Sequence, residues 1–230
     1  MRLVVFDIDD TLTRTMEVDG ECFLQTVEEQ LGLDTSQLRW SEFPHVTDTG
    51  LLDVLFRKAR GNPPTLGEHD RFLARFFQVL QAEHGRNPHR FRAIPGAREI
   101  LTTLRNSDQW CVALATGAWF RTARFKLLAA GIDPDGLPFA TSDDHHTRAG
   151  IVTRAIRRAE EAAGLTEGFD AIVAVGDGAW DVATASELGL SFIGVGPPER
   201  LADIGAQVGV GDYTDPGTFF SLLEQATTGQ

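Results

Sequence analysis

Acidic residues come directly after the first apolar run of the chain. Leu3 to Phe6 is short, apolar and rich in β-branched residues, which favours a buried strand. Because side chains alternate across a strand, Asp7 and Asp9 should point to one side and Ile8 to the other. Ligands of open α/β sheets bind just outside the carboxyl ends of the strands. Two carboxylates are therefore expected to share a place where such folds do chemistry, although an acidic turn is the simpler alternative.

A hydroxyl residue and a glycine, Thr116-Gly117, follow a second apolar run. Trp110 to Ala115 indicates a strand, and Ala118 to Ala130, ended by Gly131, indicates a helix. Backbone N–H groups at a helix N-terminus have no partner within the helix and attract negative charge. The segment therefore favours an anion such as phosphate, and an ordinary helix cap at Thr116 is the alternative.

A third polar segment follows the apolar run Ala171 to Val175. Glycines on either side of Asp177 permit a tight turn that brings its carboxylate to the strand end, and Asp181 lies one helical turn further on. Magnesium prefers oxygen ligands and usually keeps waters and phosphate oxygens, so a few carboxylates suffice to hold it. Acids at two strand ends thus predict a magnesium site, although a Gly-Asp-Gly turn alone is more often a plain loop.

The order of these motifs resembles the haloacid dehalogenase-like superfamily of phosphotransferases. Its opening signature, an apolar strand followed by Asp-x-Asp-x-Thr, matches Asp7-Ile8-Asp9-Asp10-Thr11. Thr116-Gly117 matches its second motif, and Gly176 to Asp181 is similar to its Gly-Asp-x-x-x-Asp motif. The amino-acid sequence from Thr116 to Gly131 looks most like that of the phosphoglycolate-phosphatase-like branch of the superfamily. This resemblance covers the whole core and leaves the segment after the first strand unmatched.

The resemblance also implies a cation that neutralises the phosphate, usually a Lys, and here the sequence departs from the pattern. The expected region, residues 142–150, contains no Lys, and Arg148 is the best candidate. Arginine can bind phosphate with two parallel hydrogen bonds and stays charged. Lys126 is the competitor, but it is expected in the middle of a helix with a solvated side chain.

The resemblance implies a role for each matched residue. Asp7 would attack phosphorus and form an aspartyl-phosphate, and Asp9 would carry the proton of the leaving group. Magnesium would be held by Asp7, Asp177 and the Asp9 backbone carbonyl. The residues expected to bind phosphate are Thr11, Thr116, Gly117 and Arg148. Asp181 would tune the metal or Arg148 from behind, and Thr116 and Arg148 also count as catalytic.

The implied activity is a magnesium-dependent phosphatase acting on a small phosphomonoester, and three alternatives remain open. A haloacid dehalogenase would attack carbon and needs no metal, which Asp9 and Asp177 argue against. A phosphosugar mutase uses the same residues and must exclude water. A catalytically idle binding protein on this fold is the third, kept open by the change from Lys to Arg.

The elements that must position these residues alternate between strand and helix. Besides those named above, helices are expected from Pro95-Gly96 to about Asn106 and at 148–163, 180–188 and 218–225, and strands at 139–141 and 191–195. This alternation predicts a doubly wound parallel α/β sheet, Rossmann-like, formed by residues 1–13 and 93–230.

Residues 14–92 differ, because they show helical periodicity at 20–31, 51–59 and 71–83 and no convincing strand. The resemblance implies that this insertion is a helical cap over the active site. His45, Thr47 and Asp48 are its candidate substrate contacts, with ordinary N-capping as the alternative. Trp119 and Trp180 border the pocket or pack in the core.

The amino-acid composition limits the classes of molecule that the protein is expected to bind. The 33 acidic and 21 basic residues give a formal charge of −12, which argues against nucleic acid and anionic membranes and favours a small phosphorylated metabolite. Cys22 and Cys111 lie far apart in the sequence, the first apolar run is too short for a signal peptide, and no stretch reaches membrane-spanning length. We expect a reduced, cytoplasmic protein; the sequence carries no sign of its oligomeric state.

Overall fold

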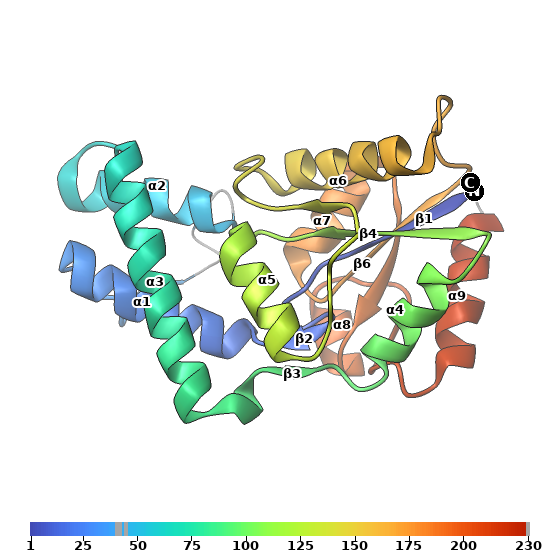
Figure 1. Cartoon of the computed structure of the whole chain (residues 1–230), viewed down its shortest axis with the longest axis horizontal. Coiled ribbons are helices and arrows are strands. Elements are labelled where there is room, and N and C mark those ends of the chain that lie inside the picture. Colours follow the sequence, from blue (N-terminus) through green and yellow to red (C-terminus); the bar gives the residue numbers. More distant parts are fainter. Residues whose placement is uncertain (40–42, 44–45, 229–230) are drawn as a thin grey trace.

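The computed structural model describes residues 1–39, 43 and 46–228. Within them a parallel sheet of six strands has the order β5-β4-β1-β6-β7-β8 (Figure 1). The strands are β1 (Arg2–Phe6), β4 (Trp110–Ala115), β5 (Phe139–Ala140), β6 (Ile172–Gly176), β7 (Ser191–Val195) and β8 (Gly209–Val210). β1 lies between β4 and β6, so the first strand of the chain is central, as its apolar sequence predicts.

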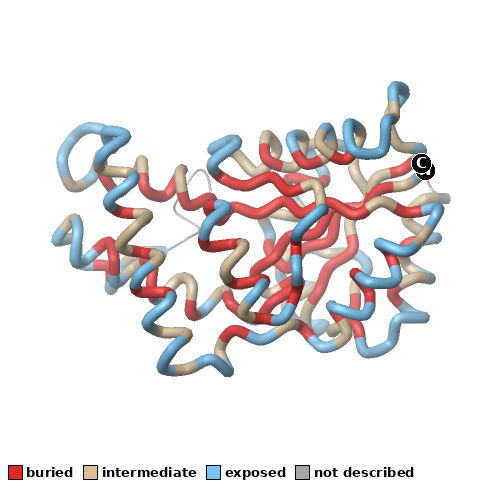
Figure 2. Tube along the Cα trace, in the orientation of Figure 1, coloured by how far each residue is buried: buried red, intermediate tan, exposed pale blue. Residues whose placement is uncertain are grey.

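Helices cover both faces of the sheet, because strand side chains alternate between two apolar clusters. Val4 and Phe6 face α4 (Ala97–Arg105), α5 (Phe120–Ala129) and α9 (Pro216–Thr228). Leu3 and Val5 face α6 (Arg148–Ala163). Figure 2 shows the strands buried between helices whose outer faces are exposed. The predicted doubly wound α/β core is confirmed.

The insertion is helical and lies beyond the carboxyl ends of the strands, at the left of Figure 1. It consists of α1 (Met16–Leu31), α2 (Asp48–Arg60) and α3 (Leu66–Arg86), followed by the short 3-10 helix η2 (Pro88–Arg90). Its interior contains Phe23, Phe72 and Phe76, and the indole of Trp119 from the core joins them. The cap therefore has its own apolar cluster, into which one core side chain inserts. The exact domain limits, 14–92 and the remainder, stay a prediction.

Two short strands were missed in the sequence. β2 (Thr13–Arg14) and β3 (Arg92–Ala93) pair in antiparallel fashion, with Thr13 opposite Ala93. They lie where the chain leaves the core for the cap and where it returns. Two residues are too few for an alternating pattern, so periodicity could not detect them.

Most other boundaries differ from the expected ones by a few residues. α6 and β7 have the predicted limits, whereas α1 begins four residues before the predicted Gly20 and α5 begins at Phe120 instead of Ala118. α7 (Ala179–Leu188) agrees within one residue. α8 (Pro198–Asp203) and β8 were not expected, because both are short.

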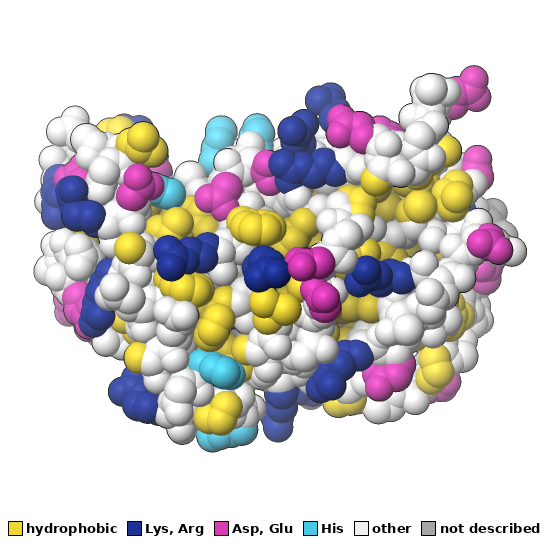
Figure 3. All heavy atoms as spheres, in the orientation of Figure 1, with side chains coloured by type: hydrophobic (Ala, Val, Ile, Leu, Met, Phe, Trp, Pro, Cys, Tyr) yellow, Lys and Arg dark blue, Asp and Glu magenta, His cyan; other side chains and the backbone are white. Residues whose placement is uncertain are grey.

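Basic and acidic side chains are interspersed over the face shown in Figure 3.

Candidate active site

The first strand delivers its acids as the alternation predicts. Asp7 and Asp9 are 5% and 6% exposed, and Ile8 between them packs in the core on the other side. The Asp7 N–H donates to the Val175 carbonyl at 2.9 Å, which extends the ladder past the end of β1. The chain then turns at Asp10, whose φ of 53° is the one left-handed value at a non-glycine residue in the described chain. Short polar side chains tolerate this region better than most.

Three carboxylates gather at the ends of β1 and β6, and we call Asp7, Asp177 and Asp181 the strand-end cluster. One oxygen from each lies within 4.8 Å of the others. Asp181 is held in place because its Oδ2 accepts hydrogen bonds from the Asp177 and Gly178 N–H groups at 3.2 and 3.1 Å. Asp181 was predicted to act on the metal or on Arg148 without binding the metal itself. In the structure its carboxylate lies with those of Asp7 and Asp177, the two expected ligands. The Asp9 side chain does not belong to this cluster.

The donor set of this cluster fits a divalent cation. Asp7 Oδ2 and Asp177 Oδ1 are buried and have no hydrogen-bond partner among the residues that the structure describes. Burial most of all, and next the neighbouring Asp181 charge, raise the pKa of Asp7 to about 8 and that of Asp177 to about 9. Clustered carboxylates in a dry site need a cation to stay ionised together. An oxygen-only ligand set suits magnesium or calcium better than softer metals.

Arg148, the predicted phosphate cation, faces this cluster from the first turn of α6. Its Nη1 donates to Asp7 Oδ1 at 3.1 Å and lies 3.6 Å from Asp181 Oδ1. Its Nε donates to the Val46 carbonyl at 2.9 Å, which anchors the guanidinium. The indole of Trp180 packs against it, with 5.6 Å between the guanidinium carbon and the ring centroid. Arg148 is thus fixed beside the carboxylate expected to attack phosphorus.

Arg200, at α8, escaped the sequence analysis. It forms an ion pair with Asp177 and a second with Asp10 at 3.2 Å. Its helix is short and lies outside every motif, so the only available signal was a basic residue soon after β7. Arg200 supplies a positive charge to an acid that is expected to bind metal.

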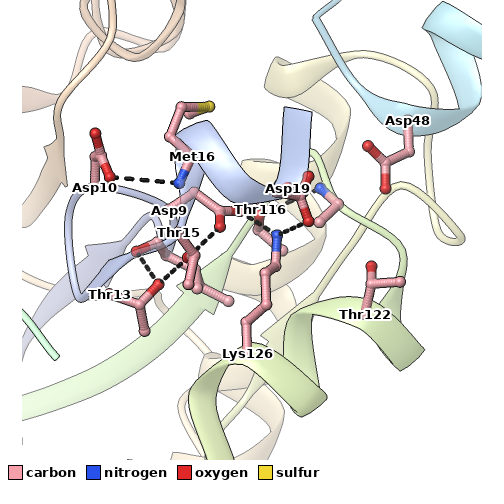
Figure 4. Close-up of polar contacts among 12 residues, drawn as sticks. Asp9, Asp10, Thr13, Thr15, Met16, Asp19, Asp48, Thr116, Thr122 and Lys126 are labelled. Atoms are coloured by element: carbon pink, nitrogen blue, oxygen red, sulfur yellow. Dashed lines mark hydrogen bonds and ion pairs between the residues drawn. The ribbon is translucent and has the colours of Figure 1, made fainter. Parts of the chain in front are cut away.

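The expectation for Lys126 was wrong. Its side chain is fully buried, and its Nζ donates to Asp9 Oδ2 at 2.6 Å and to Asp19 Oδ1 at 2.7 Å (Figure 4). Burial alone would lower the pKa of Lys126, but the carboxylates of Asp19, Asp9 and Asp48 raise it above its ordinary value. Ala123 and Leu127 share the buried face of α5 with Lys126, and this spacing was the available signal. We call Asp9, Asp19, Asp48 and Lys126 the cap-side cluster.

The carboxylate of Asp9 is held from two sides. Its Oδ1 accepts a hydrogen bond from the Thr15 hydroxyl at 2.5 Å, while Lys126 binds Oδ2. The Thr15 hydroxyl lies 2.5 Å from that of Thr13, which in turn donates to the Ile8 carbonyl at 3.2 Å (Figure 4). Both oxygens of the predicted proton carrier are therefore fixed by the chain itself.

The phosphate loop differs in one respect from the prediction. The helix after Thr116-Gly117 begins at Phe120, whose N–H already donates to Asp143 Oδ2 at 2.6 Å. The helix N-terminus is therefore occupied, because carboxylates satisfy its first N–H groups. A Cβ at Gly117 would lie 2.7 Å from Arg148 Nη2, so only glycine allows this close approach. Any anion site here rests on the Thr116 hydroxyl, the Gly117 backbone and Arg148.

A pocket lined by residues of both the cap and the core lies above this loop. Asp9, Thr116, Gly117 and Arg148 are among its core residues; its cap residues include Met16, Asp19, Phe23, Asp48 and Leu51. Trp180 also lines it, whereas Trp119 is fully buried in the cap interior, which is the packing alternative. Thr11 is buried too, and its hydroxyl does not reach this pocket. Its predicted phosphate contact stays a prediction.

Two of the three cap candidates lie near the pocket. Thr47 caps α2, because its hydroxyl accepts from the Gly50 N–H at 3.1 Å, as the capping alternative expects. Asp48 lines the pocket, and its Oδ2 accepts from the Trp119 N–H at 3.0 Å. His45 lies outside the described residues. Asp19 was missed because it stands at the start of a helix with no motif around it.

Residues 1–189 match the family model of the haloacid dehalogenase-like hydrolases. The chain belongs to this family. The match includes the first strand with Asp7, the whole helical cap and the Asp177 turn. The resemblance to the superfamily is thereby confirmed, and the protein is a hydrolase of this family; the phosphoglycolate-phosphatase-like branch stays a prediction.

Solved structures of similar fold cover nearly the whole chain. A hydrolase from Pseudomonas syringae is 23% identical with a TM-score of 0.67, over 98% of this chain and 99% of its own. A β-phosphoglucomutase from Clostridium difficile is 15% identical with a TM-score of 0.70, over 98% and 97%. A predicted phosphatase from Clostridium acetobutylicum is 20% identical with a TM-score of 0.58, over 97% and 98%. At these identities the likeness concerns the fold.

The remaining observations concern relatives, membrane helices and cysteines. None of the curated proteins compared with this chain matches, and none of its described helices is both long and apolar enough to cross a membrane. Cys22 is buried and Cys111 is half-buried, and both are free thiols. Cys111 lies at the start of β4.

Proposed function

We propose that this hydrolase is a magnesium-dependent phosphatase that cleaves small phosphomonoesters through an aspartyl-phosphate on Asp7. The observation that carries the proposal is the position of Asp7. Its Oδ2 is free, its Oδ1 binds the Arg148 guanidinium at 3.1 Å, and Asp177 and Asp181 adjoin it. A nucleophilic carboxylate, a carboxylate cluster and a fixed cation thus meet at one strand end.

In the first step Asp7 Oδ2 attacks phosphorus, and the bond from phosphorus to the leaving oxygen breaks. Arg148 and the Gly117 backbone bind the equatorial oxygens, where negative charge is spread in the transition state. Asp9 gives its proton to the departing alkoxide. Asp7, Asp177 and the Asp9 backbone carbonyl, with Asp181 beside them, would hold magnesium, which would offset the repulsion between carboxylate and phosphate.

In the second step Asp9 takes a proton from a water molecule, whose oxygen attacks phosphorus and releases inorganic phosphate and the Asp7 carboxylate. Thr15 and Lys126 hold Asp9 at both oxygens, so the same carboxyl serves both steps without turning. The substrate is a small phosphorylated metabolite, and we place the reaction in the cytoplasm.

A phosphosugar mutase would share these residues and pass the phosphoryl group to a second hydroxyl instead of water. The similarity in fold to a β-phosphoglucomutase is the observation that supports this alternative. A dehalogenase agrees less well with the strand-end cluster, because attack on carbon needs no second and third carboxylate.

The test is the turnover of p-nitrophenyl phosphate in magnesium by the wild type and by Asp7→Asn. We expect Asp7→Asn to lose turnover while keeping or raising its melting temperature, since it removes a buried carboxylate whose pKa is raised to about 8. A beryllofluoride adduct should form on the wild type only. Retained turnover in Asp7→Asn would sink the assignment of the nucleophile, and release of inorganic phosphate distinguishes a phosphatase from a mutase.

A further inference from the structure

The pocket above the phosphate loop has an unusual charge balance for an enzyme that binds a dianion. Asp9, Asp19 and Asp48 line it, whereas Arg148 is the one basic side chain among its described lining residues. Arg148 is directed at Asp7, and the ammonium of Lys126 is already shared by Asp9 and Asp19. The space beside the leaving group therefore has acceptors and no available cation.

Among the three acids that line the pocket, Asp48 is the most informative, because one of its oxygens has no hydrogen-bond donor within the described chain. Its residue is 7% exposed; Oδ2 accepts from the Trp119 N–H, and Oδ1 has no hydrogen bond within the described chain. Figure 4 shows the Asp48 carboxyl turned toward Asp19 and Lys126, across the pocket from α5. Because Asp48 lines the pocket, its Oδ1 can accept a hydrogen bond from a ligand there.

Asp48 is also close to the chemistry. Its N–H donates to the Gly117 carbonyl at 2.7 Å, so the start of α2 rests directly on the phosphate loop. A leaving group that departs from the phosphate toward the cap must therefore pass Asp48. The apolar lining of the pocket includes Met16, Phe23 and Leu51.

These groups discriminate by charge. A second phosphate or a carboxylate on the leaving group would lie beside the acids Asp19 and Asp48 with no cation available to pair with it. A hydroxyl or ammonium group would instead donate to Asp48 Oδ1. The pKa of Asp48 is raised by burial, most of all, and by the Asp19 charge, and a bound donor would offset that effect.

We propose that the substrate is the phosphate monoester of an alcohol that carries a hydroxyl or ammonium donor and no second anionic group, with Asp48 as the residue that selects it. The proposal rests on the phosphatase function above. It separates this chain from the phosphoglycolate-phosphatase-like branch, whose namesake substrate bears a carboxylate.

Four substrates of nearly equal size test the proposal: 2-hydroxyethyl phosphate, O-phosphoethanolamine, n-propyl phosphate and 2-phosphoglycolate. We expect kcat/KM for the better of the two donors to exceed that for n-propyl phosphate by about 10-fold or more, and that for 2-phosphoglycolate by about 100-fold or more. The hydroxyl and ammonium compounds show which donor is preferred. Preference for 2-phosphoglycolate, or equal rates for all four, overturns the proposal.

Asp48→Asn tests the assigned residue. Asn can still accept from the Trp119 N–H but presents an amide donor to the pocket, so the ratio of donor substrate to n-propyl phosphate should fall about 10-fold or more, with 2-phosphoglycolate gaining relative to both. Asp53→Asn on the same helix, whose side chain is 40% exposed and paired with Arg57, is the matched control and should keep the wild-type ratios. A structural role of Asp48 alone would lower all four rates together and leave the ratios unchanged, which contradicts selection by Asp48.

The two proposals fail in different ways. If neither p-nitrophenyl phosphate nor any of the four esters is hydrolysed in magnesium, the phosphatase function is wrong. If p-nitrophenyl phosphate is hydrolysed and the donor esters are not preferred, only the substrate class is wrong.

Discussion

The strand-end cluster and the cap-side cluster each place three carboxylates beside a cation, but they differ in how their charge is balanced. In the strand-end cluster Arg148 contacts one acid closely, and buried oxygens of Asp7 and Asp177 stay unpaired. In the cap-side cluster the ammonium of Lys126 bridges Asp9 and Asp19 within 2.7 Å. The first cluster is arranged for ligands from outside, whereas in the second Lys126 pairs with Asp9 and Asp19 and only Asp48 keeps an oxygen for a ligand.

The difference suggests a division of labour. Unpaired buried carboxylates weaken a fold unless something binds them, so the strand-end cluster lowers stability to gain a reactive site. The ion pairs of Lys126 tie core helix α5 to cap helix α1 and hold Asp9. Substitutions in the first cluster should therefore affect turnover most, and those in the second should affect stability as well.

Arg148→Met is expected to have the largest effect on turnover. Loss of the guanidinium leaves the transferring phosphoryl group without its fixed cation, so kcat/KM for p-nitrophenyl phosphate should fall by about 10²- to 10³-fold. Arg148→Lys should recover only part of this loss, because an ammonium does not reproduce the planar fork. A loss below 10-fold in Arg148→Met would mean that another group neutralises the phosphate.

Lys126→Met should lower both stability and turnover. It leaves Asp9 and Asp19 as buried carboxylates without their shared cation, and breaking a buried pair costs about 3–5 kcal/mol. Urea unfolding followed by circular dichroism measures this difference. Lys58→Met, at an exposed position on α2, is the control and should change stability by less than about 0.5 kcal/mol. Similar values for both variants would show that Lys126 does not neutralise the cap-side cluster.

The smallest effect concerns the pH dependence of stability through Asp19. Burial raises its pKa to about 6, so the folded state holds a proton that the unfolded state releases near pH 4. The stability that this proton contributes is present below about pH 4 and is lost as the pH rises through about 6. Relative to Asp19→Asn, the wild type should lose about 1–3 kcal/mol between pH 4 and 7. Parallel profiles of the two proteins would contradict the raised pKa.

The sequence placed Asp7 and Asp177 of the strand-end cluster together because each stands in a contiguous motif directly after an apolar strand, whereas it set Asp181 behind them. Parallel strands end at the same edge, so Asp7, Thr116 and Asp177 had to meet there once the sheet was predicted. Arg148 followed from chain order alone. The same reasoning failed for the helix after Gly117. Its first N–H groups were expected to bind phosphate, but they donate to the carboxylates of Asp48 and Asp143.

The cap-side cluster could not be predicted in the same way, because its members come from β1, α1, α2 and α5. How two helices of an insertion pack over a core is decided by tertiary contacts, such as Trp119 in the cap interior, that no short pattern encodes. Lys126 was misjudged because a lysine in mid-helix usually reaches water. Its place on the face shared with Ala123 and Leu127 would have indicated burial.

The pairing of β2 with β3 has a consequence for how such a molecule could arise and be re-engineered. The chain departs for the cap at Arg14 and returns opposite that residue at Arg92, so the two cut points are neighbours across an antiparallel ribbon. Paired residues in such a ribbon are separated by only about 5 Å. A tight turn could join them, and the helices between them form an exchangeable module: a different insertion on the same two strands would leave the strand-end chemistry in place and present it to another substrate.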